Sequence, residues 1–97
     1  MATYILLASF TEKGIKAVRD TVKRADAVRK MGKKAGVTMK DAYWTLGAYD
    51  VVSVFEAPDD ETMTAFMLRA AEEGFVRTQT LRAFPEAEMQ KILDKLA

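Results

Sequence analysis

The chain has no cysteine and no histidine among its 97 residues. Without cysteine it cannot form disulfide bonds, thiol nucleophiles, or cysteine-ligated zinc and iron–sulfur sites. Without histidine it lacks the commonest metal ligand and the usual general base near neutral pH. We therefore expect no metal site and no cofactor. Any catalysis would have to depend on carboxylates, tyrosine, lysine or arginine.

Long apolar runs are also missing. The first ten residues, MATYILLASF, lack the basic flank and the longer apolar segment of a secretion signal. No stretch approaches the roughly 20 apolar residues that span a membrane. We therefore expect no membrane association and a cytoplasmic location. The length predicts a single domain over residues 1–97, of a size that gains stability from oligomerisation.

The apolar pattern predicts a strand at residues 3–10 and then one continuous helix. The strand is apolar at nearly every position, which is typical of a strand covered on both faces. The helix is expected to run from a Thr11 N-cap to Ala35, with Gly36 as its end. Its apolar face is expected to comprise Ile15, Val18, Val22, Ala25, Val28, Met31 and Ala35.

The rest of the chain predicts a hairpin, a helix, a fourth strand and a last helix. Gly47-Ala48 is typical of a two-residue turn between strands at 37–46 and 49–57. That register places Trp44 opposite Val51 and Tyr43 opposite Val52. Asp59 is a natural N-cap for a helix at 62–73, and Gly74 follows that helix. A strand at 75–84 and a short helix complete the chain; the residues of that helix expected to face inward are Met89, Ile92, Leu93 and Leu96.

The order β-α-β-β-α-β plus a C-terminal helix predicts a ferredoxin-like α+β fold, with a four-stranded antiparallel sheet and two helices on one face. The first and third strands are apolar on both sides, so the second face of the sheet needs a cover. The simplest cover is the same face of a second copy. We therefore predict a face-to-face homodimer, or a higher homo-oligomer. The residues expected at this dimer sheet are Tyr4, Trp44, Phe55 and Phe75.

Short motifs resemble the GYD-domain family of small bacterial and archaeal proteins. They are Thr11 with Gly14-Ile15-Lys16, LGAYD at 46–50, EAPDD at 56–60, GFVRT at 74–78 and TLRAF at 80–84. The resemblance covers nearly the whole chain. It implies a dimeric α+β barrel and brings no settled activity. One departure is Phe75, where a polar residue, often asparagine, is expected. If that position lines a pocket, the ligand differs here.

A second, shorter resemblance is to the effector-binding domains of the leucine-responsive regulators. Those domains share the topology, a Gly-x-Tyr-Asp hairpin and a Val-x-Arg-Thr strand. They bind amino acids between subunits, so the likeness implies a ligand in the cleft between sheet and partner subunit. The candidate ligand-binding residues are Tyr43, Tyr49, Asp50, Arg77 and Arg82.

Each candidate residue also has a structural interpretation. Asp50 can accept backbone or Thr45 hydrogen bonds near the turn, and Tyr49 can plug the end of the sheet. Arg77 and Arg82 fall on opposite faces of the fourth strand by alternation. Either arginine can hold a ligand carboxylate or pair with an acidic side chain. For Asp50 and Tyr49 we favour the structural interpretation.

Three functions remain open from the sequence. We favour a non-catalytic small-molecule-binding or assembly module that acts as a homo-oligomer. The alternative is a cofactor-independent oxygenase or isomerase that uses Asp50, Tyr43 and Arg77 in an apolar cavity between subunits. A third is nucleic-acid binding through residues 12–35, which carry nine basic residues against three acidic ones. We do not favour the third, because Asp20 and Asp26 interleave with the basic residues and no aromatic residue lies among them.

Overall fold

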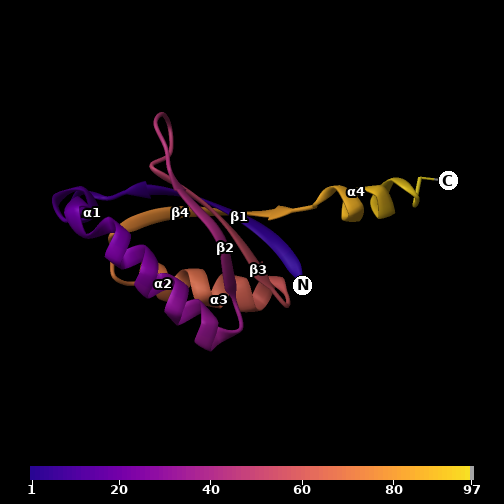
Figure 1. The fold of residues 1–97 in the computed structure, drawn as a ribbon, viewed down its shortest axis with the longest axis horizontal. Helices are drawn as coiled ribbons and strands as arrows, with labels where there is room; N and C mark the ends of the chain where they lie inside the picture. The colour runs from indigo at the N-terminus through magenta and orange to yellow at the C-terminus, as the bar shows by residue number, and fades with distance from the viewer. Residues whose placement is uncertain (97) are drawn as a thin grey trace.

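The computed structural model describes residues 1–96 and has the predicted element order, with a break in the first helical segment (Figure 1). A four-stranded antiparallel sheet has the strand order β2-β3-β1-β4. No helix in this part of the chain is long and apolar enough to cross a membrane. The elements are β1 (Ala2–Phe10), α1 (Glu12–Lys16), a 3-10 turn (Val18–Asp20), α2 (Thr21–Ala35), β2 (Thr38–Trp44), β3 (Val51–Ala57), α3 (Asp60–Ala71), β4 (Val76–Ala83) and α4 (Glu86–Leu93).

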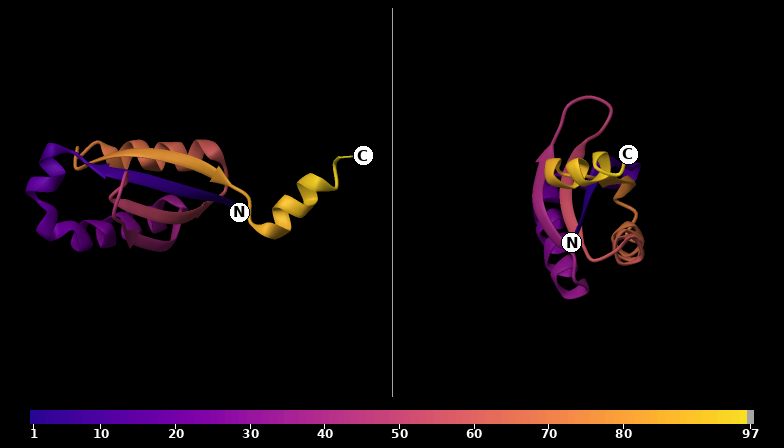
Figure 2. Two further views of the ribbon diagram at one scale, coloured as in Figure 1. Left: turned by 90° about the horizontal axis from the view of Figure 1, so that it is seen from above. Right: turned by 90° about the vertical axis from the view of Figure 1, so that its right-hand side faces the viewer.

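The sheet has one covered face and one open face. Tyr4, which pairs with Phe55 of β3, belongs to the buried core that the side chains of α3 complete, and residues of α2 pack against this core. Figures 1 and 2 show α2 and α3 on the same side of the sheet. Ile5, next along β1, pairs with Val54 and Leu81 on the opposite side. No element of the described chain covers that side, which we call the open face.

The predicted helix from Thr11 to Ala35 is wrong as a single element. Thr11 caps α1 as expected, because its hydroxyl accepts a hydrogen bond from the Gly14 N–H at 3.0 Å. The helix then breaks at Ala17, whose φ of −106° and ψ of 23° are not helical. Arg24 donates from Nη1 to the Ala17 carbonyl oxygen at 2.9 Å and so satisfies a carbonyl at the break. Residues expected on one buried face are therefore redirected, and Ile15 is 53% exposed.

The hairpin is confirmed in its register. Trp44 pairs with Val51 and Tyr43 with Val52, while the Thr45 N–H donates to the Asp50 carbonyl at 2.9 Å. Gly47 has the expected positive φ, at 107°, but the two-residue turn is not seen, because the last hydrogen bond of the hairpin joins Thr45 to Asp50 and residues 46–49 lie beyond it. The regular strands are shorter than predicted, since β2 ends at Trp44 and β3 begins at Val51.

The last helix does not face inward, so that prediction is wrong. α4 extends away from the sheet and the other helices, as Figures 1 and 2 show from perpendicular directions. Met89, Ile92 and Leu93 are each exposed by more than a third. Leu96 is 76% exposed. The tail therefore leaves the open face of the sheet uncovered and adds a second uncovered apolar surface.

Candidate binding surfaces and cavity

A cavity of about 150 Å³ lies between the sheet and the helices. Its walls come from the covered face of the sheet and from α2 and α3. Most of the lining side chains are apolar, so the cavity can accept a small apolar group. The apolar wall includes Leu6, Val28, Met31, Met39, Phe55 and Met67.

Aromatic and cationic side chains lie together at this cavity. Phe75 lines it, and the Arg24 guanidinium carbon lies 4.4 Å from the Phe75 ring centroid. The Lys13 Nζ lies 4.5 Å from the same centroid. Both distances are within the range of cation–π attraction. The position at which the sequence departs from the expected polar residue is thus a cavity position, held by two cations.

Trp44 lines the same cavity and is 42% exposed. Its indole Nε1–H donates to the Thr21 hydroxyl at 3.0 Å, which joins the end of β2 to the start of α2. Because this is the only tryptophan of the chain, a change of its fluorescence reports on the surroundings of this one side chain at the cavity wall.

Two of the motifs that carry the family resemblance meet in space. The Thr11 N–H donates to the Phe75 carbonyl at 3.1 Å, and the Thr11 hydroxyl donates to the Gly74 carbonyl at 2.6 Å. Lys13 Nζ donates to the Glu73 carbonyl at 2.6 Å. We call the contact of residues 11–14 with residues 73–75 the junction. It joins the start of α1 to the segment before β4, so these motif residues have a structural role.

Three of the five predicted ligand-binding residues lie on the open face. Tyr43 pairs with Val52 and is 57% exposed. Arg77 lies two residues before Gln79 on β4 and therefore on the same side of the strand, where Gln79 pairs with Leu7 of the open face. The Tyr49 hydroxyl donates to the Gln79 Oε1 at 3.1 Å, which places Tyr49 beside the same surface. A ligand role for these side chains stays a prediction.

Asp50 is engaged by the backbone. Its Oδ2 accepts a hydrogen bond from the Phe10 N–H at 2.9 Å, and its own N–H donates to the Ala8 carbonyl at 2.9 Å. These two bonds extend the pairing of β1 with the segment before β3. They agree with the structural interpretation of Asp50. The Thr45 hydroxyl bonds instead to the Tyr49 carbonyl.

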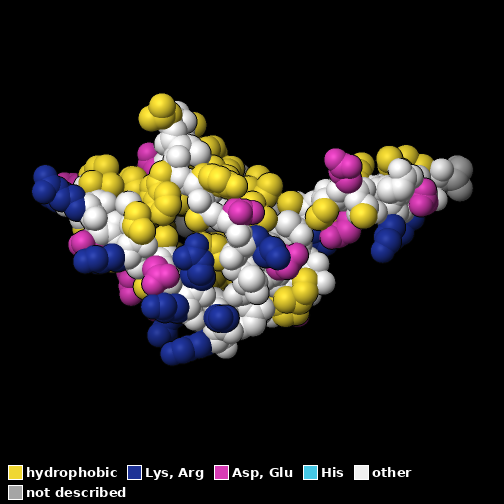
Figure 3. Space-filling model, in the orientation of Figure 1, with side chains coloured by type: hydrophobic (Ala, Val, Ile, Leu, Met, Phe, Trp, Pro, Cys, Tyr) yellow, Lys and Arg dark blue, Asp and Glu magenta, His cyan; other side chains and the backbone are white. Residues whose placement is uncertain are grey.

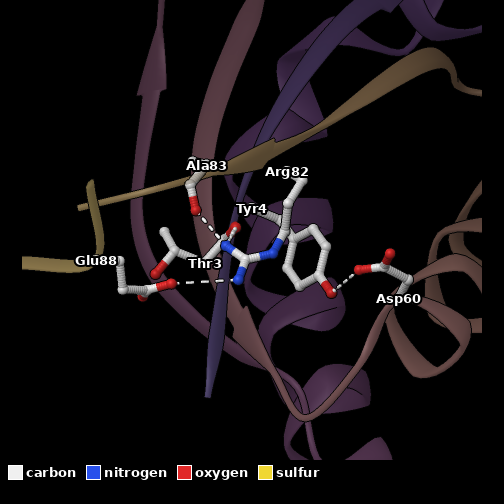
Figure 4. Close-up of polar contacts among 6 residues, drawn as sticks. All are labelled: Thr3, Tyr4, Asp60, Arg82, Ala83 and Glu88. Atoms are coloured by element: carbon white, nitrogen blue, oxygen red, sulfur yellow. Dashed lines mark hydrogen bonds and ion pairs between the residues drawn. The ribbon is translucent and has the colours of Figure 1, made fainter. Parts of the chain in front are cut away.

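Arg82 lies on the covered side of β4, opposite to Arg77 as the alternation predicts, and fixes the start of α4 (Figure 4). Its guanidinium donates to the carbonyls of Thr3 and Ala83 and pairs with Glu88 at 3.2 Å. It also lies 4.6 Å from the Phe84 ring centroid. These contacts hold α4 at a set direction from the sheet.

Tyr4 is 3% exposed and donates from its hydroxyl to the Asp60 Oδ1 at 2.5 Å (Figure 4). Burial, then the hydrogen bond to the Asp60 carboxylate, raises the pKa of Tyr4 to about 12 from the ordinary 10.0. Because the folded pKa lies above the unfolded one, the contribution to stability is complete below pH 10. It is lost as the pH rises through 12.

We expect Tyr4→Phe to lower the free energy of unfolding by about 2 kcal/mol at pH 8, since a hydrogen bond to a charged group is lost. The difference from the native chain should narrow as the pH rises from 10 to 12. Urea unfolding at a series of pH values measures it. Tyr43→Phe, at an exposed position, is the control, and it should change the free energy of unfolding little at any of these pH values. If the free energy of unfolding of Tyr4→Phe stays below that of the native chain by a constant amount up to pH 12, the raised pKa of Tyr4 is contradicted.

The aromatic residues expected at the dimer sheet are on the other face. Tyr4 and Phe55 are buried beneath the helices, at 3% and 1% exposure. Trp44 and Phe75 line the cavity on that same side. Their placement on the open face is therefore wrong, and the apolar residues that do lie there are aliphatic. Those between the two central strands are Ile5, Leu7, Val52 and Val54, with Leu81 on β4.

The sequence did not single out Arg24, one of nine basic residues between 12 and 35. The break at Ala17 turns it toward the sheet, where it lines the cavity. The one available signal was the departure at Phe75, which now lies against Arg24. Within residues 1–96 no three acidic side chains gather as a metal site.

Comparison with known proteins shows which family the sequence matches and which solved structures have a similar fold. A family model described as GYD domain matches residues 4–93. The protein named glutamine synthetase and cystathionine beta-lyase binding protein, from Thermus thermophilus, is 36% identical over 90 residues, which is 92% of this chain and 95% of that protein. The crystal structure of TTHA0845 from the same organism aligns with a TM-score of 0.56 and 22% identity, over 88% of this chain and 95% of that one. A hypothetical protein, PHS023, from Pyrococcus horikoshii aligns with a TM-score of 0.56 and 19% identity, over 89% and 93%. The structural likenesses confirm the predicted ferredoxin-like fold.

Proposed function

The chain belongs to the GYD-domain family, and from that premise we propose that it is a non-catalytic protein-binding module that works as a homodimer. The observation that carries the proposal is the exposed apolar face of α4. Because the helix is held away from its own domain, no residue of the described chain buries that apolar face. A partner that offers a groove would bury it.

The geometry of α4 suits helix-in-groove recognition. Its exposed apolar residues Met89, Ile92 and Leu93 fall at i, i+3 and i+4, the spacing of anchor residues on one helix face, and the exposed Leu96 follows just after the helix ends. Figure 3 shows apolar side chains on the upper side of the projecting helix toward its end and basic side chains below, with acidic side chains on both sides. The ion pair of Arg82 with Glu88 holds the helix start, so less orientational freedom is lost on binding.

The open face of the sheet supports the homodimer. The middle of its two central strands carries four part-exposed aliphatic side chains: Ile5 and Leu7 of β1 and Val52 and Val54 of β3. Tyr43 and Arg77 lie at its margins. An aliphatic centre with a polar margin is the usual anatomy of a protein interface. A two-fold pairing of this face buries the centre of both copies at once.

The partner class follows from the relative that is named as binding glutamine synthetase and cystathionine beta-lyase. We propose that this chain binds enzymes of the same two classes, with α4 in a groove of the enzyme. The homodimer then presents two α4 helices, so an oligomeric enzyme is held more tightly than by one helix.

The test measures binding of the purified chain to glutamine synthetase and to cystathionine beta-lyase from its own host. Biolayer interferometry is the measurement. We expect native binding, weakened at least about tenfold by Ile92→Gln, because a central apolar anchor is lost. Lys91→Gln is the matched control on the other side of the same helix and should bind like the native chain. Equal binding by both variants would overturn the role of α4. Binding of the native chain to neither enzyme would overturn the partner class.

The two alternatives gain no support from the geometry. The cavity found here lies within one chain, and its lining includes neither Asp50 nor any tyrosine. The basic side chains that Figure 3 shows over α2 are partly paired, since Asp26 contacts Lys30 at 3.1 Å and Arg29 at 3.6 Å. A solvated helix face accounts for them.

A further inference from the structure

The cavity on the covered side of the sheet contains a buried cationic atom without a partner. Arg24 Nη2 is shielded from solvent and makes no hydrogen bond, and it is the one such side-chain atom among the described residues. A guanidinium stays charged at all physiological pH values. Leaving a charged donor buried and unpaired is costly, so an acceptor is expected beside it.

The surroundings fix the direction in which that acceptor must lie. Nη1 of Arg24 is already bonded to the Ala17 carbonyl at 2.9 Å, and the Phe75 ring covers one face of the guanidinium at 4.4 Å. The space that remains open to Arg24 is the cavity that it lines. The polar side chains of the lining are Thr21, Ser53, Thr78 and Glu73, and none of them bonds to Arg24 Nη2 in the structure. Because the rest of the wall is aliphatic and aromatic, a ligand in the cavity can bring the acceptor that Nη2 lacks.

We propose that this cavity binds a small monocarboxylic acid with a compact apolar tail, its carboxylate bonded to Arg24. This site lies outside the protein-binding function proposed above, because it uses neither α4 nor the open face. Arginine is the preferred partner of carboxylates. An apolar cavity of about 150 Å³ holds a molecule of roughly the size of benzene. A ligand of about six to ten non-hydrogen atoms therefore fits within it.

Glu73 is the one acidic side chain of the cavity lining and is exposed. It makes no ion pair with Arg24 in the structure, although it is the protein's own candidate for that role. A carboxylate at the rim disfavours ligands of higher negative charge, such as phosphates, more than it disfavours a monoanion. The rim and the buried cation together therefore select a single negative charge placed deep in the cavity.

The probes are benzoate and its neutral analogue benzyl alcohol, with Trp44 fluorescence as the readout, since Trp44 lines the cavity and is the only tryptophan. We expect a saturable change with benzoate and at least about tenfold weaker binding of benzyl alcohol. This comparison uses the native chain, so it decides the question even if a variant fails to fold. Equal affinity for the two probes, or no binding of either, would overturn the proposal.

Three variants locate the site. Arg24→Met should weaken benzoate at least about tenfold and leave benzyl alcohol unchanged, whereas Arg29→Met, on the exposed side of α2, should bind both like the native chain. Ala70→Phe fills the cavity from α3 and should abolish both signals. Glu73→Gln should strengthen benzoate binding. If Glu73→Gln and Arg24→Met instead lower the free energy of unfolding by similar amounts, and Glu73→Gln leaves benzoate binding unchanged, Glu73 is the partner of Arg24 and the proposal fails. None of these outcomes changes binding through α4.

Discussion

The Val52→Asp variant should be a folded monomer at concentrations at which the native chain forms the proposed homodimer. Val52 lies at the centre of the open face, where it pairs with Leu7 of β1 and Tyr43 of β2. In a two-fold interface each substitution places two unpaired carboxylates in the contact, one from each copy. Each buried unpaired group costs roughly 1–3 kcal/mol. Two such groups cost at least about 2 kcal/mol, so the dissociation constant should rise at least about 30-fold.

Sedimentation velocity over a range of concentrations measures the change, with circular dichroism as the check on folding. Val22→Asp is the matched control, because Val22 is 66% exposed on α2, away from the open face. It should dimerise like the native chain. If the native chain stays monomeric at micromolar concentration, the proposed homodimer is contradicted. A Val52→Asp variant that dimerises normally would move the interface to another surface.

The hairpin was predictable because its information is local. Gly47 supplies the positive φ of the turn, and once the turn is fixed the register of Trp44 with Val51 follows. The caps at Thr11 and Asp59 are local in the same sense: each side chain accepts from an N–H three residues later in the sequence. These features needed no knowledge of the rest of the fold.

The break in the first helix was not predictable, because its cause is a contact between distant segments. The helical spacing of the apolar residues alone favours one helix that continues through Ala17, where no proline interrupts it. The junction with Phe75 fixes α1 beside the start of β4, and α2 has to run along the covered face. The turn between the two directions falls at Ala17. The position of Arg24 at the cavity depends on this break, so the candidate site was hidden with it.

Alternation along the strands separates residues into two faces and does not say which face the helices cover. The sequence therefore predicted correctly that Arg77 and Arg82 lie on opposite sides of β4. It assigned Tyr4 and Phe55 to the wrong side, because aromatic residues suit a core and an interface equally well. The apolar stripe of α4 misled for a related reason. An amphipathic helix indicates that something covers its apolar face, without saying that the same domain does so.

The Gly14→Ala variant should lower the free energy of unfolding by about 3 kcal/mol. A Cβ at this position would lie 1.9 Å from the Phe75 carbonyl oxygen and 3.0 Å from its carbonyl carbon. That oxygen cannot move aside cheaply, because it accepts the Thr11 N–H hydrogen bond of the junction. Gly14 is not among the glycines with a positive φ, so the reason for glycine here is close approach of two backbone segments.

The sign of this effect separates the junction from local helix propensity. Alanine is a better helix former than glycine by about 1 kcal/mol, so propensity alone predicts that Gly14→Ala stabilises the protein. Urea unfolding gives the sign, and Glu12→Ala in the same short helix is the control, because Glu12 is exposed and loses only its contact with Lys16, worth about 0.5 kcal/mol or less. A Gly14→Ala variant as stable as the native chain would mean that α1 does not dock on the Phe75 backbone. In that case nothing would oblige the helix to break at Ala17, and Arg24 would lose the contact that turns it toward the cavity.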